Sequence, residues 1–195
     1  MKIQVAASKY TTVEALTQNY AFLPARFKDA YLVALLTDFT GHKIIIFVAT
    51  CAATLRVALL LRHLDFPAVA INGKMPQDKR LAALGAFKAG TRKIIVSTDV
   101  AGRGLDIPNL DLVVNYDVPA NPKEYVHRVG RTARAGRSGR AVCLVSQYDV
   151  ENLQRIEHLT GKQMTEYAIP ESTAQALQTS VLEAGRLAGN ELRAL

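Results

Sequence analysis

Lys43-Ile44-Ile45-Ile46-Phe47-Val48 is a run of β-branched and aromatic residues with the length of one strand, and together with residues 49–64 it decides the fold. Thr50 can cap a helix, and apolar residues then recur at helical spacing as far as Leu64. A strand that is apolar on both faces and leads into an amphipathic helix is typical of a buried parallel sheet. The stretch therefore predicts one strand-helix unit of an α/β domain.

The same alternation continues along the chain. We expect strands at 18–24, 68–71, 93–97, 112–116 and 141–145, and helices at about 25–39, 76–90, 122–131 and 150–159. These elements predict an α/β domain with a mostly parallel sheet and helices on both faces. We expect a lead-in at 1–17, the domain at 18–167 and a helical extension at 168–195, which carries Leu177, Val181, Ala184 and Leu187 at helical spacing.

The composition is that of a globular protein with a basic surface. The 195 residues are 49% hydrophobic, and 24 Lys and Arg against 17 Asp and Glu give a net charge of +7, which suits a polyanionic partner. Cys51 and Cys143 lie in apolar segments and indicate reduced core residues of an intracellular protein. The four histidines are scattered, so we expect no metal site. No apolar run is long enough to cross a bilayer, and the first residues do not resemble a signal peptide.

Five arginines fall at every third position from Arg128 to Arg140. Crowded guanidinium groups repel one another, and their planar donors match phosphate well. The run is therefore either a solvated basic loop or a phosphate-binding edge, and its own pattern leaves both interpretations open.

The segment from Ser97 to Asp106 leaves a predicted strand and offers a hydroxyl, an arginine and two carboxylates at the carboxyl edge of the sheet, where ligands bind in such folds. A dinucleotide-binding loop is excluded because Gly102 and Gly104 lack a third glycine at the required spacing. A tight turn and a ligand-binding role both remain possible from the local pattern.

No loop in the sequence is suited to cradle a nucleotide. Residues 85–92 have the glycine spacing of a P-loop but lack its Lys-Ser/Thr pair, and they lie at a helix end. A metal-binding carboxylate at Asp99 has little use without a P-loop. Arginines that face phosphate without such a loop indicate fingers supplied across an interface to a nucleotide held elsewhere.

Four ordered segments closely resemble motifs of the DEAD-box RNA helicases. Residues 46–50 resemble motif IV, 77–80 motif IVa, 98–106 motif V and 127–134 motif VI. The resemblance covers about residues 15 to 165 and implies the second, C-terminal RecA-like domain, with its three-layer fold. Residues 28–32 and 147–151 look most like the nucleolar branch that processes precursors of ribosomal RNA.

The resemblance implies a role for each matching residue. Arg131 and Arg134 match arginine fingers on the γ-phosphate, Asp106 a carboxylate that meets the ATP ribose, and His127 a histidine that couples the two lobes. The positions that hold the RNA backbone are matched by Thr50, Gly73, Gln77, Arg80, Thr98 and Arg103. We expect Arg128 to fix the local fold, and Arg137 and Arg140 to be exposed.

The sequence departs from the family pattern in two places. Ala133 stands where motif VI commonly has glycine, and we expect Arg134 still to reach the phosphate. Asn72 precedes Gly73 where relatives often have histidine, which puts a histidine contact in doubt but leaves the close approach of the glycine to RNA.

The P-loop, the Asp-Glu-Ala-Asp site and the adenine-reading glutamine motif of the first lobe are missing from the sequence, so it resembles half of an enzyme. The resemblance implies that ATP and Mg are held mainly by the absent lobe, and that the isolated chain is inactive. RNA, the first lobe and pre-ribosomal proteins are the expected partners of a monomer in the nucleus, with the nucleolus as its site. Two alternatives stay open: a non-enzymatic RNA-binding or regulatory module, and a lobe of a DNA helicase from the same superfamily.

Overall fold

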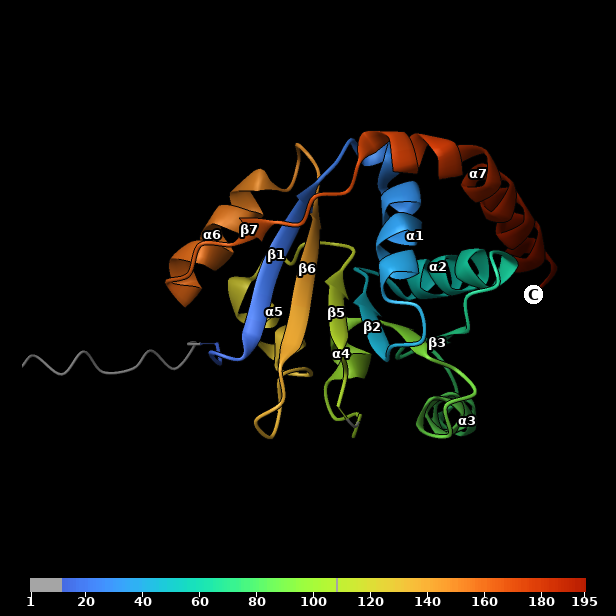
Figure 1. The fold of residues 1–195 in the computed structure, drawn as a ribbon. Coiled ribbons are helices and arrows are strands. Elements are labelled where there is room, and N and C mark those ends of the chain that lie inside the picture. Colours follow the sequence, from blue (N-terminus) through green and yellow to red (C-terminus); the bar gives the residue numbers. More distant parts are fainter. Residues whose placement is uncertain (1–11, 108) are drawn as a thin grey trace, which may run out of the picture.

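The apolar runs of the sequence form the strands of one sheet in the computed structural model, which describes residues 12–107 and 109–195 (Figure 1). The sheet order is β3-β4-β2-β5-β6-β1-β7, and every neighbouring pair is parallel. The strands are β1 Leu16–Phe22, β2 Ile44–Phe47, β3 Ala68–Ile71, β4 Ile94–Ser97, β5 Leu112–Asn115, β6 Gly139–Val145 and β7 Thr165–Glu166.

Strand β2 lies inside the sheet, between β4 and β5. Its Ile45 is in register with Ile95 on one side and with Val113 on the other, and every residue of these three strands is buried. Side chains alternate between the two faces, and both faces are covered. The run at 43–48 therefore forms a strand buried on both faces, as its apolar character predicted.

Two layers of helices enclose the sheet (Figure 1). One layer packs on Ile44 and Ile46, and consists of α1 Lys28–Asp38, α2 Cys51–His63 and α7 Glu171–Ala194. The other packs on Ile45 and Phe47, and consists of α3 Gln77–Lys88, α4 Asp99–Gly102, α5 Pro122–Val129 and α6 Val150–Thr160. The predicted arrangement, a parallel sheet with helices on both faces, is confirmed.

The predicted elements agree with the observed ones to within a few residues, with three exceptions. The short helix α4 was not among the expected helices. The helix expected at 25–39 begins with a separate 3-10 turn, Ala25–Phe27, before α1. Strand β7 was not expected at all, because it is short and its two residues are exposed.

The spacing of Leu81, Leu84 and Phe87 predicts that they share one apolar face of α3, and this prediction is partly wrong. Phe87 is fully buried and Leu84 packs beside it, but Leu81 is 58% exposed. At 100° per residue Leu81 lies about 120° around the helix from Phe87. Ala83, one turn before Phe87, takes the buried position instead.

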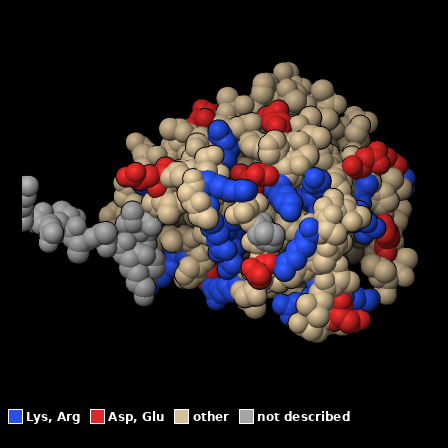
Figure 2. Space-filling model, turned by 60° about the horizontal axis from the view of Figure 1, so that its bottom comes forward, with Lys and Arg blue, Asp and Glu red and all other residues tan. Residues whose placement is uncertain are grey.

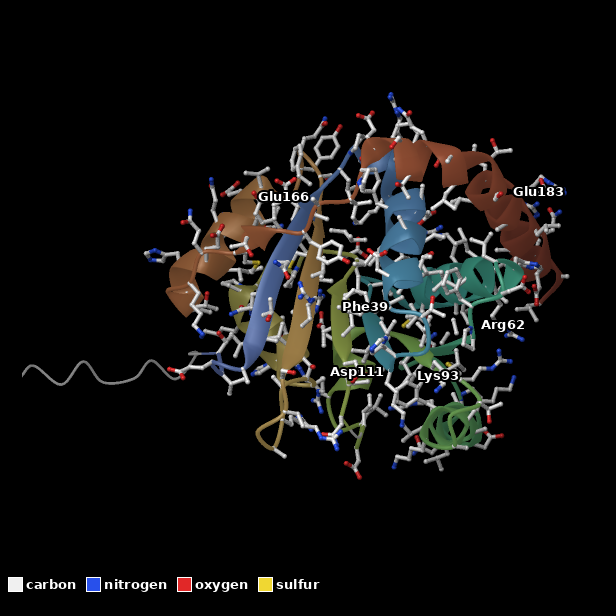
Figure 3. All side chains as sticks on the ribbon, viewed as in Figure 1. Phe39, Arg62, Lys93, Asp111, Glu166 and Glu183 are labelled. Atoms are coloured by element: carbon white, nitrogen blue, oxygen red, sulfur yellow. The ribbon has the colours of Figure 1, made fainter. Side chains whose placement is uncertain are left out.

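Helix α7 forms part of the core. Ala174, Val181, Ala184 and Ala188 are buried against α1 and α2. On its outer side, Glu183 pairs with Arg186, and Figure 3 shows Glu183 pointing into solvent. No helix in the described residues is long and apolar enough to span a membrane.

The domain limits at 17 and 167 stay predictions. Leu16 and Thr17, expected in the lead-in, belong to β1, and residues 1–11 of the lead-in lie outside the described residues.

Candidate nucleotide and nucleic-acid interface

Arg128 of α5 is the central cation of the site and is 3% exposed. Its guanidinium binds both carboxylate oxygens of Asp99, with the Nε–Oδ1 distance at 2.5 Å and the Nη2–Oδ2 distance at 2.8 Å. Its Nη1 donates to Asn115 Oδ1 at 3.2 Å and to the Asp117 carbonyl at 2.6 Å. The centre of the Phe47 ring lies 5.2 Å from the guanidinium carbon. Arg128 thus ties α5 to the ends of β2, β4 and β5, which confirms its predicted structural role.

Asp117 extends this network to the loop after β2. Its Oδ2 accepts a hydrogen bond from the Ala49 N–H at 2.8 Å, and its Oδ1 pairs with Lys28 Nζ at 3.2 Å. The loop that carries Thr50 is therefore fixed to the loop that Arg128 binds. Asp117 and Asp99 were not predicted from the sequence to fix these loops. The sequence feature that could have indicated it is a carboxylate just after a buried strand.

Arg131 is half-buried and not neutralised. Its Nη1 donates to the Leu105 carbonyl at 3.3 Å. Burial, and then the positive charge of Arg134, lower the pKa of Arg131. Within the described part of the chain, neither of these arginines forms an ion pair. The two cations therefore stand close together without an anion, as a phosphate-binding pair does.

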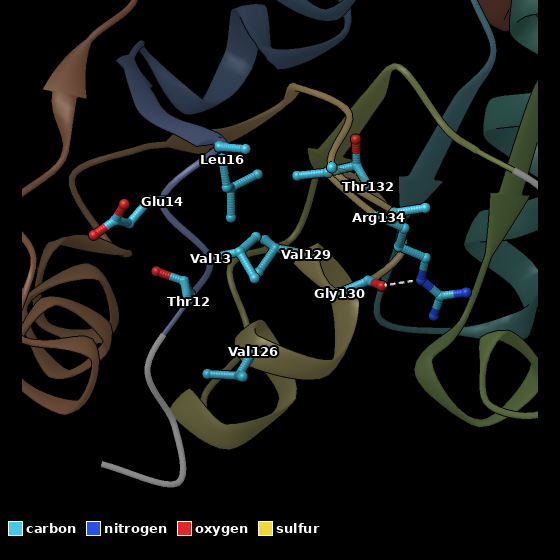
Figure 4. Close-up of a pocket in the computed structure, with 13 residues that line it drawn as sticks. Thr12, Val13, Glu14, Leu16, Val126, Val129, Gly130, Thr132 and Arg134 are labelled. Atoms are coloured by element: carbon cyan, nitrogen blue, oxygen red, sulfur yellow. Dashed lines mark hydrogen bonds between the residues drawn. The ribbon is translucent and has the colours of Figure 1, made fainter. Parts of the chain in front are cut away.

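Arg134 is exposed, and its Nε donates to the Gly130 carbonyl at 2.6 Å, as Figure 4 shows. Ala133 has φ +55° and Ala135 has φ +54°, in the left-handed region that glycine adopts more easily. Ala133, at the usual glycine position, thus adopts the left-handed conformation in the turn that carries Arg134.

A cavity of about 610 Å³ opens beside this turn, between the segment that enters β1 and helix α5. Residues 12–16, Val126, Val129, Gly130 and residues 132–136 line it. In Figure 4 the guanidinium of Arg134 points away from Val126 and Val129. The wall of the cavity is mainly apolar, and Arg134 is the cationic residue among those that line it.

Arg103 and His127 meet at Glu124. Arg103 forms an ion pair with Glu124 Oε1, and His127 Nδ1 lies 3.9 Å from Glu124 Oε2. Arg131 lines the same small pocket, whereas Asp106 is exposed and is not part of its wall. The structure brings together Arg103, His127 and Arg131 and leaves Asp106 apart from them. Glu124 was not identified from the sequence, because it occupies an ordinary position for an acidic residue near a helix start.

Thr50 and Thr98 follow the neighbouring strands β2 and β4. Thr50 caps α2, since its hydroxyl oxygen accepts a hydrogen bond from the Ala53 N–H at 3.1 Å. Thr98 precedes α4 and is 8% exposed, but its hydroxyl makes no capping hydrogen bond. The backbone geometry of a cap is present at both positions, but only Thr50 uses its side chain for it.

Gly73, Gln77 and Arg80 follow β3, the next strand in the sheet order. Arg80 Nη1 lies 3.4 Å from Gln77 Oε1, and Arg80 Nε is buried without a hydrogen-bond partner in the described residues. A Cβ on Gly73 would meet no atom within 4 Å. The fold therefore does not require a glycine at 73. All the predicted RNA-contact residues lie after β2, β3 or β4, and Gln77 and Arg80 lie on the first turn of α3.

Asn72 is 1% exposed and serves the fold. Its Nδ2 donates to Thr54 Oγ1 at 2.8 Å, and its Oδ1 accepts from the Lys74 N–H at 3.0 Å. Asn72 therefore pins the turn after β3 to α2, and its amide is committed to contacts inside the protein.

Arg137 and Arg140, the last two arginines of the row, differ in exposure. Arg137 is exposed, as expected. Arg140 is half-buried: its Nη1 donates to Asn19 Oδ1 at 2.7 Å and its guanidinium lies 5.6 Å from the Tyr167 ring. The prediction that Arg140 is merely exposed is wrong, because its position in β6 places it against β1.

The face that carries α3 and α4 is basic. Figure 2 shows Lys and Arg side chains gathered across the middle of this face, with a few acidic side chains among them. Within the described ranges, no group of three His, Cys, Asp or Glu side chains could hold a metal ion. This face presents guanidinium, ammonium, hydroxyl and imidazole groups, which can bind an anion.

Comparison with known proteins gives consistent matches. The family described as helicase conserved C-terminal domain matches residues 28–136. ATP-dependent RNA helicase DDX47 of Drosophila melanogaster is 55% identical over 100% of this chain and 38% of that protein. ATP-dependent rRNA helicase rrp3 of Botryotinia fuckeliana is 49% identical over 100% of this chain and 40% of that protein. The chain thus spans about two fifths of the curated relatives that it matches.

Solved structures match as well, at lower sequence identity. S. cerevisiae Dbp5 bound to RNA and ADP BeF3 has a TM-score of 0.76 at 30% identity, over 89% of this chain and 46% of that one. The E. coli DEAD-box protein SrmB, bound to regulator of ribonuclease activity A, has a TM-score of 0.74 at 30% identity, over 81% of this chain and 93% of that one. These likenesses confirm the RecA-like fold that the motifs implied.

Proposed function

Because this chain belongs to the family of helicase conserved C-terminal domains, we propose that it is the second lobe of an ATP-dependent RNA helicase of the DEAD-box type. It supplies arginine fingers to ATP held by a first lobe and grips RNA through the sugar-phosphate backbone. The names of its relatives, which include ATP-dependent rRNA helicases, support a role in ribosomal RNA processing.

One observation carries the nucleotide part of this proposal. Three arginines of one row differ in their partners: Arg128 is fully paired inside the lobe, while Arg131 and Arg134 have no anionic partner among the described residues. Two adjacent guanidinium groups favour an anion between them, and phosphate oxygens accept their paired N–H donors. In hydrolysis they stabilise the negative charge that develops on the transferred phosphoryl group.

The RNA part rests on the position of the polar groups at one edge of the sheet. Thr50, Gly73 and Thr98 follow β2, β3 and β4, and Gln77 and Arg80 lie on the first turn of α3. Hydroxyl, backbone and guanidinium groups of this kind bind phosphate and sugar, which positions a strand without reading its bases. Sequence preference then has to come from outside this lobe.

The remaining assignments follow from the same proposal. His127 contacts the first lobe, and Asp106, which is exposed, meets the ATP ribose when the lobes close. ATP and Mg are held mainly by the first lobe. The helicase acts as a monomer with pre-ribosomal proteins in the nucleus, at the nucleolus.

Arg131→Ala in the two-lobe protein tests the finger role. We expect RNA-stimulated ATP hydrolysis to fall on the order of a thousandfold, because the transition-state charge loses its partner. Arg137→Ala, in the same row but exposed, is the matched control and keeps normal turnover. Thermal unfolding of both variants checks that the fold is intact. Normal hydrolysis by the Arg131 variant would refute the finger role.

The isolated 195-residue chain provides a second test. We expect no ATPase activity and weak RNA binding, because the fingers act on a nucleotide that this lobe does not cradle. Sustained turnover by the chain alone contradicts the proposal. A two-lobe protein that binds RNA but does not hydrolyse ATP would instead support the alternative of a non-enzymatic RNA-binding module.

A further inference from the structure

Glu124 stands three residues after Asn121, the residue that caps α5. A carboxylate at this position ordinarily reaches back to the backbone N–H of the capping residue. Here the Asn121 side chain accepts a hydrogen bond from the Lys123 N–H at 3.1 Å, but no bond from the Asn121 N–H to Glu124 is found in the described structure. The carboxylate is turned toward α4 instead, so capping does not account for its position.

The two oxygens of Glu124 face two different functional residues. Oε1 forms the ion pair with Arg103. Oε2 is buried and has no hydrogen-bond partner in the described residues, and His127 Nδ1 lies 3.9 Å away, beyond hydrogen-bond distance. A buried carboxylate oxygen without a donor is unfavourable, so a small rotation toward the histidine N–H is favoured as soon as the carboxylate is free to move.

The Arg103 contact is the one that RNA can break. The Arg103 side chain is 52% exposed, and an ion pair this exposed contributes little free energy. A phosphate of the RNA backbone offers several oxygens to the same guanidinium and binds it more strongly than one half-buried carboxylate does. Occupancy of the RNA site and pairing with Glu124 therefore compete for Arg103.

We propose that Glu124 is a positioning residue that transmits RNA binding to the inter-lobe contact. Without RNA it holds Arg103, and His127 lacks a hydrogen-bonded carboxylate. When a phosphate takes Arg103, the carboxylate turns to accept a hydrogen bond from the His127 Nδ1–H and fixes the imidazole ring for its contact with the first lobe. The inference rests on the proposed function and adds to it the residue that makes hydrolysis respond to RNA.

The test measures ATP hydrolysis by the two-lobe protein as RNA is titrated. Glu124→Gln keeps the shape of the side chain but loses the charge that competes for Arg103. We expect the RNA concentration for half-maximal activity to fall about 2- to 5-fold. We also expect the stimulation at saturating RNA to fall about threefold or more, because the amide holds His127 less well.

Two further variants separate positioning from packing. Glu124→Asp keeps the charge and retains most of the stimulation. Arg103→Gln frees the Glu124 carboxylate without RNA, so we expect the rate of ATP hydrolysis without RNA to rise about 2- to 5-fold. This variant tests the inference even if the Glu124→Gln protein fails to fold. Glu151→Gln breaks the exposed Glu151–Arg155 pair on α6 and is the matched control, with an unchanged RNA response.

The inference is overturned if Glu124→Gln responds to RNA as Glu151→Gln does, or if Arg103→Gln leaves the RNA-free rate unchanged. Loss of stimulation in both Glu124→Gln and Glu124→Asp, with a lowered melting temperature in both, would show a packing role instead. These failures are distinct from that of the proposed function, since loss of hydrolysis in Arg131→Ala supports the finger role whatever Glu124 does.

Discussion

At the scale of single residues, the turn that carries Arg134 stores strain in its backbone. Ala135 is exposed and has φ +54°, a conformation that costs a residue with a Cβ about 1–2 kcal/mol. Ala135→Gly removes this cost but gives the unfolded chain more freedom, worth roughly 0.5–1 kcal/mol. We expect a net gain of about 0.5–1 kcal/mol in the free energy of unfolding, measured by urea denaturation of the chain.

Ala120→Gly is the matched control for this prediction. Ala120 is also an exposed loop residue, but its φ is not positive. Glycine relieves no strain there, so the variant loses up to about 1 kcal/mol. If both variants lose stability equally, the strain at Ala135 is not real.

The arginine row shows what the sequence can and cannot tell about a residue. The motif distinguished Arg128 from Arg131 and Arg134, and the contacts of Arg128 bear out its structural role. Arg140 was misjudged because its partners, Asn19 and Tyr167, lie far away along the chain and become neighbours only through the sheet. Local spacing carries no information on such contacts.

At the scale of elements, the short helix α4 approaches β2 so closely that it requires a glycine. A Cβ on Gly102 would lie 2.8 Å from Cε1 of Phe47. The Phe47 ring is buried and lies beneath the guanidinium of Arg128. Gly102→Ala therefore has to displace the ring. We expect a loss of about 1–3 kcal/mol in the free energy of unfolding, with weaker RNA-stimulated hydrolysis because the loop after β4 shifts.

Gly85→Ala shows whether the close approach is the cause. Gly85 lies inside α3, and a Cβ there meets no atom within 4 Å. Alanine is the better helix former, so this variant gains about 0.5–1 kcal/mol. Equal losses at both positions would contradict the steric explanation for Gly102.

Most elements were predictable because the sheet is buried on both faces. Apolar runs such as 43–48 then mark strands by composition alone, and capping residues such as Thr50 mark the helix starts. Prediction failed where burial is partial: α3 covers only the edge of the sheet, so Leu81 faces solvent, and the two exposed residues of β7 have no apolar signal.

At the scale of the whole molecule, the candidate site could be predicted only in part. The motifs identified the residues that face outward, since these resemble the residues of other family members. The carboxylates that fix this edge of the sheet come from separate elements: Asp99 from α4, Asp117 from the loop after β5 and Glu124 from α5. They meet their partners only through the order of the strands. These contacts are thus a property of the assembled sheet.

The contribution of α7 to stability also belongs to this scale. Helix α7 covers α1 and α2 on the face of the sheet opposite α5, and its Ala184 is 2% exposed there. Ala184→Asp places a carboxylate in an apolar contact with no partner to neutralise it. We expect a loss of at least about 3 kcal/mol in the free energy of unfolding, measured by urea denaturation of the chain.

Leu182→Asp places the same carboxylate two residues away, on the outer side of α7, where Leu182 is 62% exposed. A carboxylate in water costs little, so this variant stays within about 0.5 kcal/mol of the parent chain. If α7 were a detached extension, both aspartates would be tolerated alike. A large loss at 184 with none at 182 is expected only where the helix completes the core, because the introduced carboxylate is buried at 184 and exposed to water at 182.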